Sequence, residues 1–236
     1  MRVYCRIHAI ILVLLILTLF SQFAFAQGLN ALKSDIYSKL KCCSCEKSFE
    51  KCVCSEAKEM KAYIDALLEN KVSGINIFYK VAKKYSAKVI IDESMRLLVE
   101  ERLIKESKGK YSRVEFEPQF LNFGTKSRKE GRVSSAVKLY NKGNSNLIIS
   151  NLRVSCGCVS VALKTGKNKS PYFGVAGVNP GWQAIIEPGN FGELEVALDL
   201  SHPSMGIGKQ IRNIFVSSSD TFNPQTDLKV EIEIKE

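Results

Sequence analysis

Residues 228–234 read Leu-Lys-Val-Glu-Ile-Glu-Ile, and this strict alternation of apolar and charged side chains is the clearest fold signal in the chain. Successive side chains of a strand point to opposite faces, so a period of two predicts a strand with one buried face. Two further segments keep their apolar residues on one parity: Leu194, Val196 and Leu198, and Val133, Val137 and Leu139. Turn signals such as Asn141-Lys142-Gly143-Asn144, Pro188-Gly189 and Asn223-Pro224 separate them. We therefore expect about seven strands over residues 111–236, arranged as an antiparallel β-sandwich.

Upstream of this region the apolar spacing is helical. Four side chains follow the i, i+4, i+7, i+8 pattern of one buried stripe: Met60, Ile64, Leu67 and Leu68. Ser55 is the expected N-cap of that helix. Shorter stripes predict further helices: Leu32, Ile36 and Leu40; Ile75, Phe78, Tyr79 and Ala82; and the segment Ser94–Glu106. The chain is thus predicted to be an α+β protein of two domains, with a small three- to four-helix bundle over residues 27–108 before the sandwich.

Residues 1–26 have the pattern of a secretory signal peptide. Arg2 and Arg6 precede an uncharged apolar run, and Ala24-Phe25-Ala26 supplies a small-x-small cleavage site. The predicted location is therefore periplasmic or extracellular. The alternative is a retained anchor, since Ile7–Ala26 is just long enough to span a bilayer. Membrane association is expected only in that case.

Composition excludes several function classes. The chain has 34 Lys+Arg and 24 Asp+Glu, a formal net charge of +10, but the basic residues form short scattered clusters. No nucleic-acid-binding module is recognisable, so we expect no nucleic-acid partner. A hydrophobic content of 45% excludes a wholly disordered chain. Only two histidines, His8 and His202, are present, which excludes histidine-rich metal sites.

The cysteines carry the main chemical signal, because five of the eight fall between Cys42 and Cys54. Cys42 and Cys45 form a C-x-x-C pair whose thiols can close and open a disulfide around one turn. Nearby lysines and a following helix N-terminus favour the thiolate, which is the species that attacks another disulfide. This pattern predicts a redox site with Cys42 and Cys45 as its catalytic residues.

Two other interpretations of this cluster stay open. The cysteines can act as disulfide staples, although closing such short loops contributes only about 2–2.5 kcal/mol each. Alternatively, four thiolates can bind zinc, because C-x-x-C followed by C-x-C is acceptable ligand spacing that leaves Cys43 spare. Cys43, Cys52 and Cys54 are the candidate metal ligands outside the C-x-x-C pair. A haem-attachment motif is excluded because Glu46, not a histidine, follows Cys45.

The segment Leu40-Lys41-Cys42-x-x-Cys45 resembles the L-R-C-x-x-C motif of the periplasmic CcmH-type thiol oxidoreductases of cytochrome c biogenesis, of which this chain looks like a cysteine-rich variant. The resemblance covers roughly residues 29–91. It implies a small three-helix domain in which Cys42 and Cys45 are the redox pair. The implied partners are apocytochrome c or another protein of a thiol-disulfide relay.

A second cysteine pair occurs in Ser155-Cys156-Gly157-Cys158, after an apolar segment with strand character. Residues two apart in a straight strand lie about 6.6 Å apart, at the edge of the disulfide range. Gly157 permits the bend that brings the two sulfurs together. The alternatives are a strained, reducible disulfide, a copper(I) site on Cys156 and Cys158, or two small buried residues at a strand end.

The C-terminal half resembles a bacterial immunoglobulin-like family of unknown function. The residues that carry this resemblance are Phe123-Gly124-Thr125, the turn Asn141-Lys142-Gly143, the signature Ser155-Cys156-Gly157-Cys158, and Glu187-Pro188-Gly189. The resemblance spans roughly Val114–Glu236 and implies an immunoglobulin-like sandwich.

Three functional hypotheses follow from the sequence. The first is an exported thiol-disulfide protein, an accessory of cytochrome c maturation or of envelope thiol handling. The second is an envelope protein that binds zinc or copper. The third is a disulfide-stapled protein-interaction module without chemistry of its own.

Overall fold

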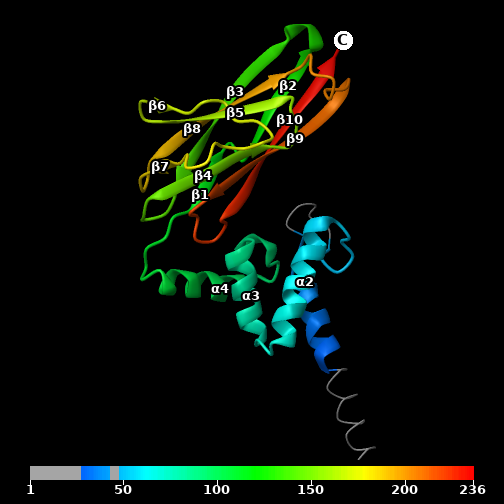
Figure 1. The fold of residues 1–236 in the computed structure, drawn as a ribbon, viewed down its shortest axis with the longest axis vertical. Coiled ribbons are helices and arrows are strands. Elements are labelled where there is room, and N and C mark those ends of the chain that lie inside the picture. The colour runs from blue at the N-terminus through cyan, green and yellow to red at the C-terminus, as the bar shows by residue number, and fades with distance from the viewer. Residues whose placement is uncertain (1–27, 43–47) are drawn as a thin grey trace, which may run out of the picture. The chain divides into compact units, whose positions relative to one another are not determined.

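The computed structural model describes residues 28–42 and 48–236 (Figure 1). The predicted signal peptide, Cys43 and Cys45 lie outside the described residues. The chain packs as two compact units: one extends to Val81 and includes Val89–Met95, and the other contains Ala82–Lys88 and Arg96–Glu236. Within the described residues, no helix is both long enough and apolar enough to cross a membrane.

The helical elements occur where the apolar stripes predict them. A helix covers residues 28–38. It is followed by α2 (Ser55–Glu69), α3 (Gly74–Lys84), the 3₁₀ turn η1 (Ala87–Val89) and α4 (Glu93–Glu106). The bundle prediction is supported in part, because the helical residues up to Val81 lie in the first unit whereas most of α4 packs in the second.

Three details of the helical prediction are wrong. The N-cap of α2 is Cys54 and not Ser55, because Cys54 has an extended backbone and its sulfur accepts the Ala57 N–H. Leu40 lies beyond the first helix and forms an isolated β-bridge with Ile90. Ile75 is exposed at the start of α3; the buried positions there begin at Ile77.

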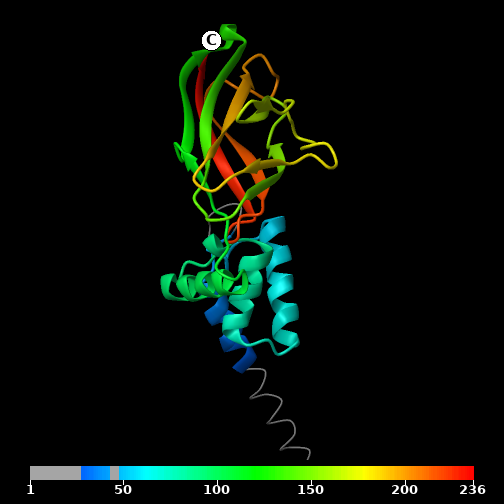
Figure 2. The same ribbon diagram turned by 90° about the vertical axis from the view of Figure 1, so that its left-hand side faces the viewer.

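The second unit holds two five-stranded sheets with a common hydrophobic core, as a sandwich requires (Figure 1). One sheet has the order β1-β3-β8-β5-β6 and the other β2-β10-β9-β4-β7. The strands are β1 (Val114–Glu117), β2 (Phe120–Ser127), β3 (Arg132–Asn141), β4 (Leu147–Val154), β5 (Val159–Thr165), β6 (Asn168–Lys169), β7 (Ala184–Ile186), β8 (Phe191–Asp199), β9 (Gly208–Ser218) and β10 (Gln225–Lys235). Figure 2 shows the long strands of this unit running along a common direction.

The period-two segments bury the face that their parity predicts. Every apolar residue of the 228–234 segment is at most 1% exposed, and Leu194, Val196 and Leu198 are fully buried. Burying each such side chain stabilises the fold by about 1.5–3 kcal/mol. The sheets are not wholly antiparallel, however, because β10 pairs with β2 in parallel and with β9 antiparallel.

The predicted Asn-Lys-Gly turn closes around the first residues of the sandwich. The side chain of Asn141 is fully buried; it accepts the Gly143 N–H and donates to the carbonyls of Ser145 and Ile186 at 2.8 and 2.9 Å. Gly143 lies directly against the Tyr111 backbone: a Cβ at this position would be 2.2 Å from the Tyr111 carbonyl oxygen. This turn therefore requires glycine because of the close approach of two backbone segments.

We expect Gly143→Ala to destabilise the second unit by at least about 2 kcal/mol, because the new methyl group meets backbone that cannot rotate away. The free energy of unfolding from urea titration measures this effect. Gly174→Ala is the matched control, since a Cβ there meets no atom within 4 Å. Equal stability of the two variants would contradict the close approach.

Candidate metal-thiolate centre

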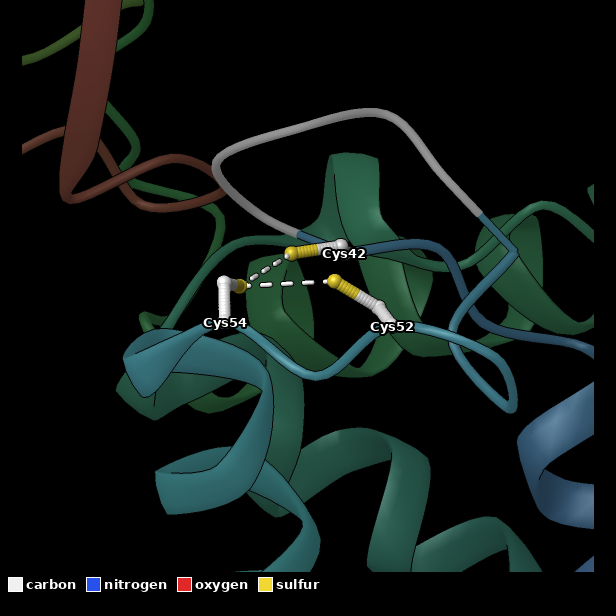
Figure 3. Close-up of side chains that lie close together, drawn as sticks. All are labelled: Cys42, Cys52 and Cys54. Carbon is white, nitrogen blue, oxygen red and sulfur yellow. Dashed lines mark hydrogen bonds between the residues drawn. The ribbon is translucent and has the colours of Figure 1, made fainter.

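Three cysteines converge in the first unit from two segments of the chain (Figure 3). Cys42 follows the β-bridge between Lys41 and Ser48. Cys52 ends a turn in which its N–H donates to the carbonyls of Ser48 and Phe49. Cys54 stands two residues further on, at the N-terminus of α2.

The sulfur atoms lie close together without a covalent bond. Cys54 Sγ is 3.4 Å from both Cys42 Sγ and Cys52 Sγ, and all three sulfurs lie within 4.8 Å of one another. A disulfide requires about 2.05 Å. Sulfurs that share a tetrahedral zinc ion with Zn–S bonds of 2.3 Å lie about 3.8 Å apart. The observed spacing is therefore close to that of ligands around one ion.

The surroundings of the cluster hold its backbone in place. Cys42 and Cys52 are buried, at 1% and 2% exposure, whereas Cys54 is half-buried. Lys61, on α2, donates to the carbonyl oxygens of Glu50 and Cys52 at 2.8 and 2.9 Å. This lysine ties the turn that carries Cys52 to the helix that Cys54 caps.

The protonation of Cys54 reflects its neighbours. The Ala57 N–H donates to Cys54 Sγ and lowers the pKa of this thiol, as expected at a helix N-terminus. The contacts with Cys52 and Cys42 and partial burial act in the opposite direction, and together they raise the pKa to about 12. Without a cation the cluster therefore keeps a proton on Cys54. A bound cation reverses this balance because it stabilises the thiolates.

The cysteines that lie together in the structure differ from the sets that the sequence predicts. Cys42, predicted as a redox residue, lies with Cys52 and Cys54, which were predicted as metal ligands. Its predicted partner Cys45, and Cys43, lie outside the described residues. The capping role of Cys54 was missed, because the adjacent Ser55 is of a residue type that is preferred at the N-cap.

The second cysteine pair is a disulfide, in agreement with one of the sequence-based alternatives. Cys156 and Cys158 are bonded, with their Cα atoms 5.2 Å apart. The chain bends here between β4 and β5, and only Cys158 is buried. So short a loop contributes only about 1.6 kcal/mol to stability. A copper(I) site on this pair would require its reduction and stays a prediction.

Comparison with known proteins bears on the sandwich unit. Residues 114–170 match the family model described as "Protein of unknown function (DUF1573)". The match is consistent with the predicted resemblance to a bacterial family of unknown function, and it includes both the Asn-Lys-Gly turn and the Ser-Cys-Gly-Cys signature. The CcmH-type resemblance of the N-terminal half stays a prediction.

Similar solved structures are distant from this chain. A protein of unknown function from Porphyromonas gingivalis W83 is 16% identical with a TM-score of 0.41, and the match covers 52% of this chain and 47% of that one. A PapD-like domain of human CEP192 is 13% identical with a TM-score of 0.33, covering 53% and 87%. A chaperone–tip adhesion subunit complex of Acinetobacter baumannii is 16% identical with a TM-score of 0.31, covering 52% of each chain. No curated protein matches the chain.

Proposed function

We propose that the protein is an exported metal-binding protein that holds a zinc ion through Cys42, Cys52 and Cys54. The observation that supports this proposal is the convergence of three sulfurs within 4.8 Å. A redox couple needs only two cysteines of the chain, whereas a shared ion accounts for a third cysteine at the same point. Three thiolates are a soft donor set of the kind that selects zinc or copper(I) over hard cations. The fourth zinc position is then left for water or another donor.

The protonation of Cys54 favours metal binding over redox catalysis at this site. The best attacking thiol has a pKa near the ambient pH, and a pKa of about 12 leaves little Cys54 thiolate at neutral pH. A metal ion lowers the pKa of its own thiol ligands and displaces their protons. The same cluster is therefore a poor nucleophile when free and a good ligand set when an ion is present.

Thiol-disulfide exchange by these sulfurs is the second candidate function. It is favoured by one observation: Cys54 Sγ is equally close to Cys42 Sγ and Cys52 Sγ. If Cys54 forms a disulfide with either of these cysteines, the remaining thiol lies beside the new disulfide. The partner would then be an envelope protein with reactive thiols. The N-terminal resemblance points to apocytochrome c or a thiol-disulfide relay protein.

One experiment separates the two candidates. The protein is purified without chelators under reducing conditions; its zinc and copper content is measured by mass spectrometry, and its thiols are alkylated. We expect about one zinc per chain and slow alkylation of the three cysteines until a chelator is added. The Cys156→Ser/Cys158→Ser double variant is the control and is expected to keep its zinc. Metal-free protein in which Cys54 forms a disulfide reversibly would support the second candidate instead.

Acid is expected to release the metal. Cys54 keeps its proton in the metal-free cluster at neutral pH, because its pKa is raised to about 12, and metal binding must displace that proton. Each displaced proton makes the affinity fall about tenfold for every unit by which the pH decreases. The dissociation constant should therefore rise at least about tenfold from pH 7 to pH 6, measured by competition with a chromophoric chelator. A pH-independent constant would contradict thiolate ligation.

A further inference from the structure

The Cys156–Cys158 disulfide borders an open cavity of about 510 Å³ in the second unit. Among the residues that line the cavity are Cys156, Gly157, His202, Ser204 and Arg212. These residues come from the bend between β4 and β5, the turn after β8, and β9. The disulfide thus lies at an accessible place, beside polar and cationic groups and the exposed apolar side chain of Ile211.

The two sulfurs of this disulfide have different environments. Cys156 is partly exposed, and its sulfur is 2.8 Å from the Ser204 hydroxyl. The hydroxyl is the donor, because a disulfide sulfur carries no proton. Cys158 is 1% exposed, and the Arg212 Nε–H donates to its sulfur at 3.3 Å. An incoming group therefore reaches Cys156, while Cys158 is next to a fixed positive charge.

Arg212 is held in this orientation by its other nitrogens. Its Nη2 donates to the Ser204 carbonyl at 2.8 Å and to Gln210 Oε1 at 3.1 Å, and its Nη1 donates to the Ile211 carbonyl at 2.8 Å. A guanidinium fixed in this way is already in place when charge develops on the neighbouring sulfur. A positive charge beside a cysteine favours its thiolate and makes it a better leaving group.

We propose that Cys156–Cys158 is a redox-active disulfide that oxidises dithiols entering this cavity. A thiolate of the dithiol attacks Cys156 Sγ, the bond between the two cysteines breaks, and its electron pair goes to Cys158 Sγ beside Arg212. The second thiol of the partner, as its thiolate, then attacks the mixed disulfide and releases Cys156 as the leaving sulfur. The partner loses two electrons and two protons and becomes a disulfide, and the cysteine pair takes up the same electrons and protons.

The other cavity residues fit the second step. Ser204 Oγ, which contacts Cys156 Sγ, is 2.8 Å from His202 Nδ1. His202 Nδ1 accepts the Ser204 backbone N–H, and the Ser204 hydroxyl can donate a hydrogen bond to the departing sulfur and stabilise its negative charge. Gly157 keeps space beside the imidazole: a Cβ there would lie 3.3 Å from His202 Nε2.

Native-state reduction by dithiothreitol tests this proposal. The full mature protein is treated with the dithiol without denaturant, quenched with an alkylating agent, and the peptide carrying Cys156 and Cys158 is quantified by mass spectrometry. We expect complete reduction in the folded protein. Arg212→Gln should slow it about tenfold, because the leaving sulfur loses its cation. Arg153→Gln, which removes an exposed positive charge from β4, should leave the rate unchanged.

Two results would overturn the proposal. The first is a pair that stays oxidised in the wild-type protein until denaturant unfolds it, and this result does not depend on any variant. The second is an Arg212→Gln protein with an intact circular dichroism spectrum that is reduced as fast as Arg153→Gln. The zinc content is measured on the same samples. The proposed zinc site and the proposed redox activity of this disulfide can therefore fail independently of each other.

Discussion

Cys54→Ser is expected to weaken zinc binding by more than about 100-fold while the helical unit stays folded. Loss of groups that only support metal ligands already costs 10–100-fold in affinity, and Cys54 is proposed as a ligand itself. The substitution is informative because Cys54 is also the N-cap of α2, and serine is a preferred N-cap residue. The change therefore removes the soft ligand without removing the cap. Dissociation constants from chelator competition measure the effect.

Ser55→Ala is the matched control for Cys54→Ser. Ser55 is the neighbouring residue in the first turn, and its hydroxyl donates to the exposed Glu56 carboxylate at 3.0 Å. We expect unchanged zinc affinity in this variant. Equal zinc affinity of Cys54→Ser and the wild type, with both proteins folded, would exclude Cys54 from the site.

Asn141→Ala is expected to destabilise the sandwich by about 3–5 kcal/mol. The side chain is fully buried, and its loss leaves the Gly143 N–H and the carbonyls of Ser145 and Ile186 without this partner. Each buried group left unsatisfied costs about 1–3 kcal/mol. Thermal unfolding followed by circular dichroism should show a midpoint lower by about 10 °C.

Asn144→Ala provides the comparison within the same turn. Asn144 also makes two side-chain hydrogen bonds, with the Tyr111 N–H and the Gly109 carbonyl, but it is exposed. Water can replace both bonds, so we expect a loss below about 1 kcal/mol. If the two variants lose the same stability, the Asn141 network is not what fixes the turn.

The sandwich was largely predictable because its signal is local. The 228–234 segment shows which side chains of β10 are buried without knowledge of its neighbours. The parallel pairing of β10 with β2 was not predictable, because parallel and antiparallel strands show the same period of two. In addition, this pairing joins residues about a hundred positions apart in the sequence. Strand direction is set by connections and core packing rather than by the pattern within one strand.

The candidate sites also combine features that the local sequence predicts with features that depend on tertiary folding. Crowding of cysteines in the sequence predicts thiol chemistry, but which sulfurs meet depends on the turn that ends at Cys52 and on the bridge between Lys41 and Ser48. The setting of Cys156 was still less predictable. Ser204 reaches Cys156 from 48 positions further along the chain, and Arg212 reaches Cys158 from 54 positions further along. Such contacts arise only from tertiary folding.

X-ray absorption at the zinc edge tests the central claim most directly, because it counts sulfur atoms around the metal without perturbing the protein. The wild-type protein, purified under reducing conditions and loaded with one equivalent of zinc, is expected to show at least three sulfur neighbours at about 2.3 Å. Cys54→Ser should show one fewer. Zinc surrounded only by oxygen or nitrogen, or protein that retains no zinc after desalting, would contradict a metal centre formed by Cys42, Cys52 and Cys54.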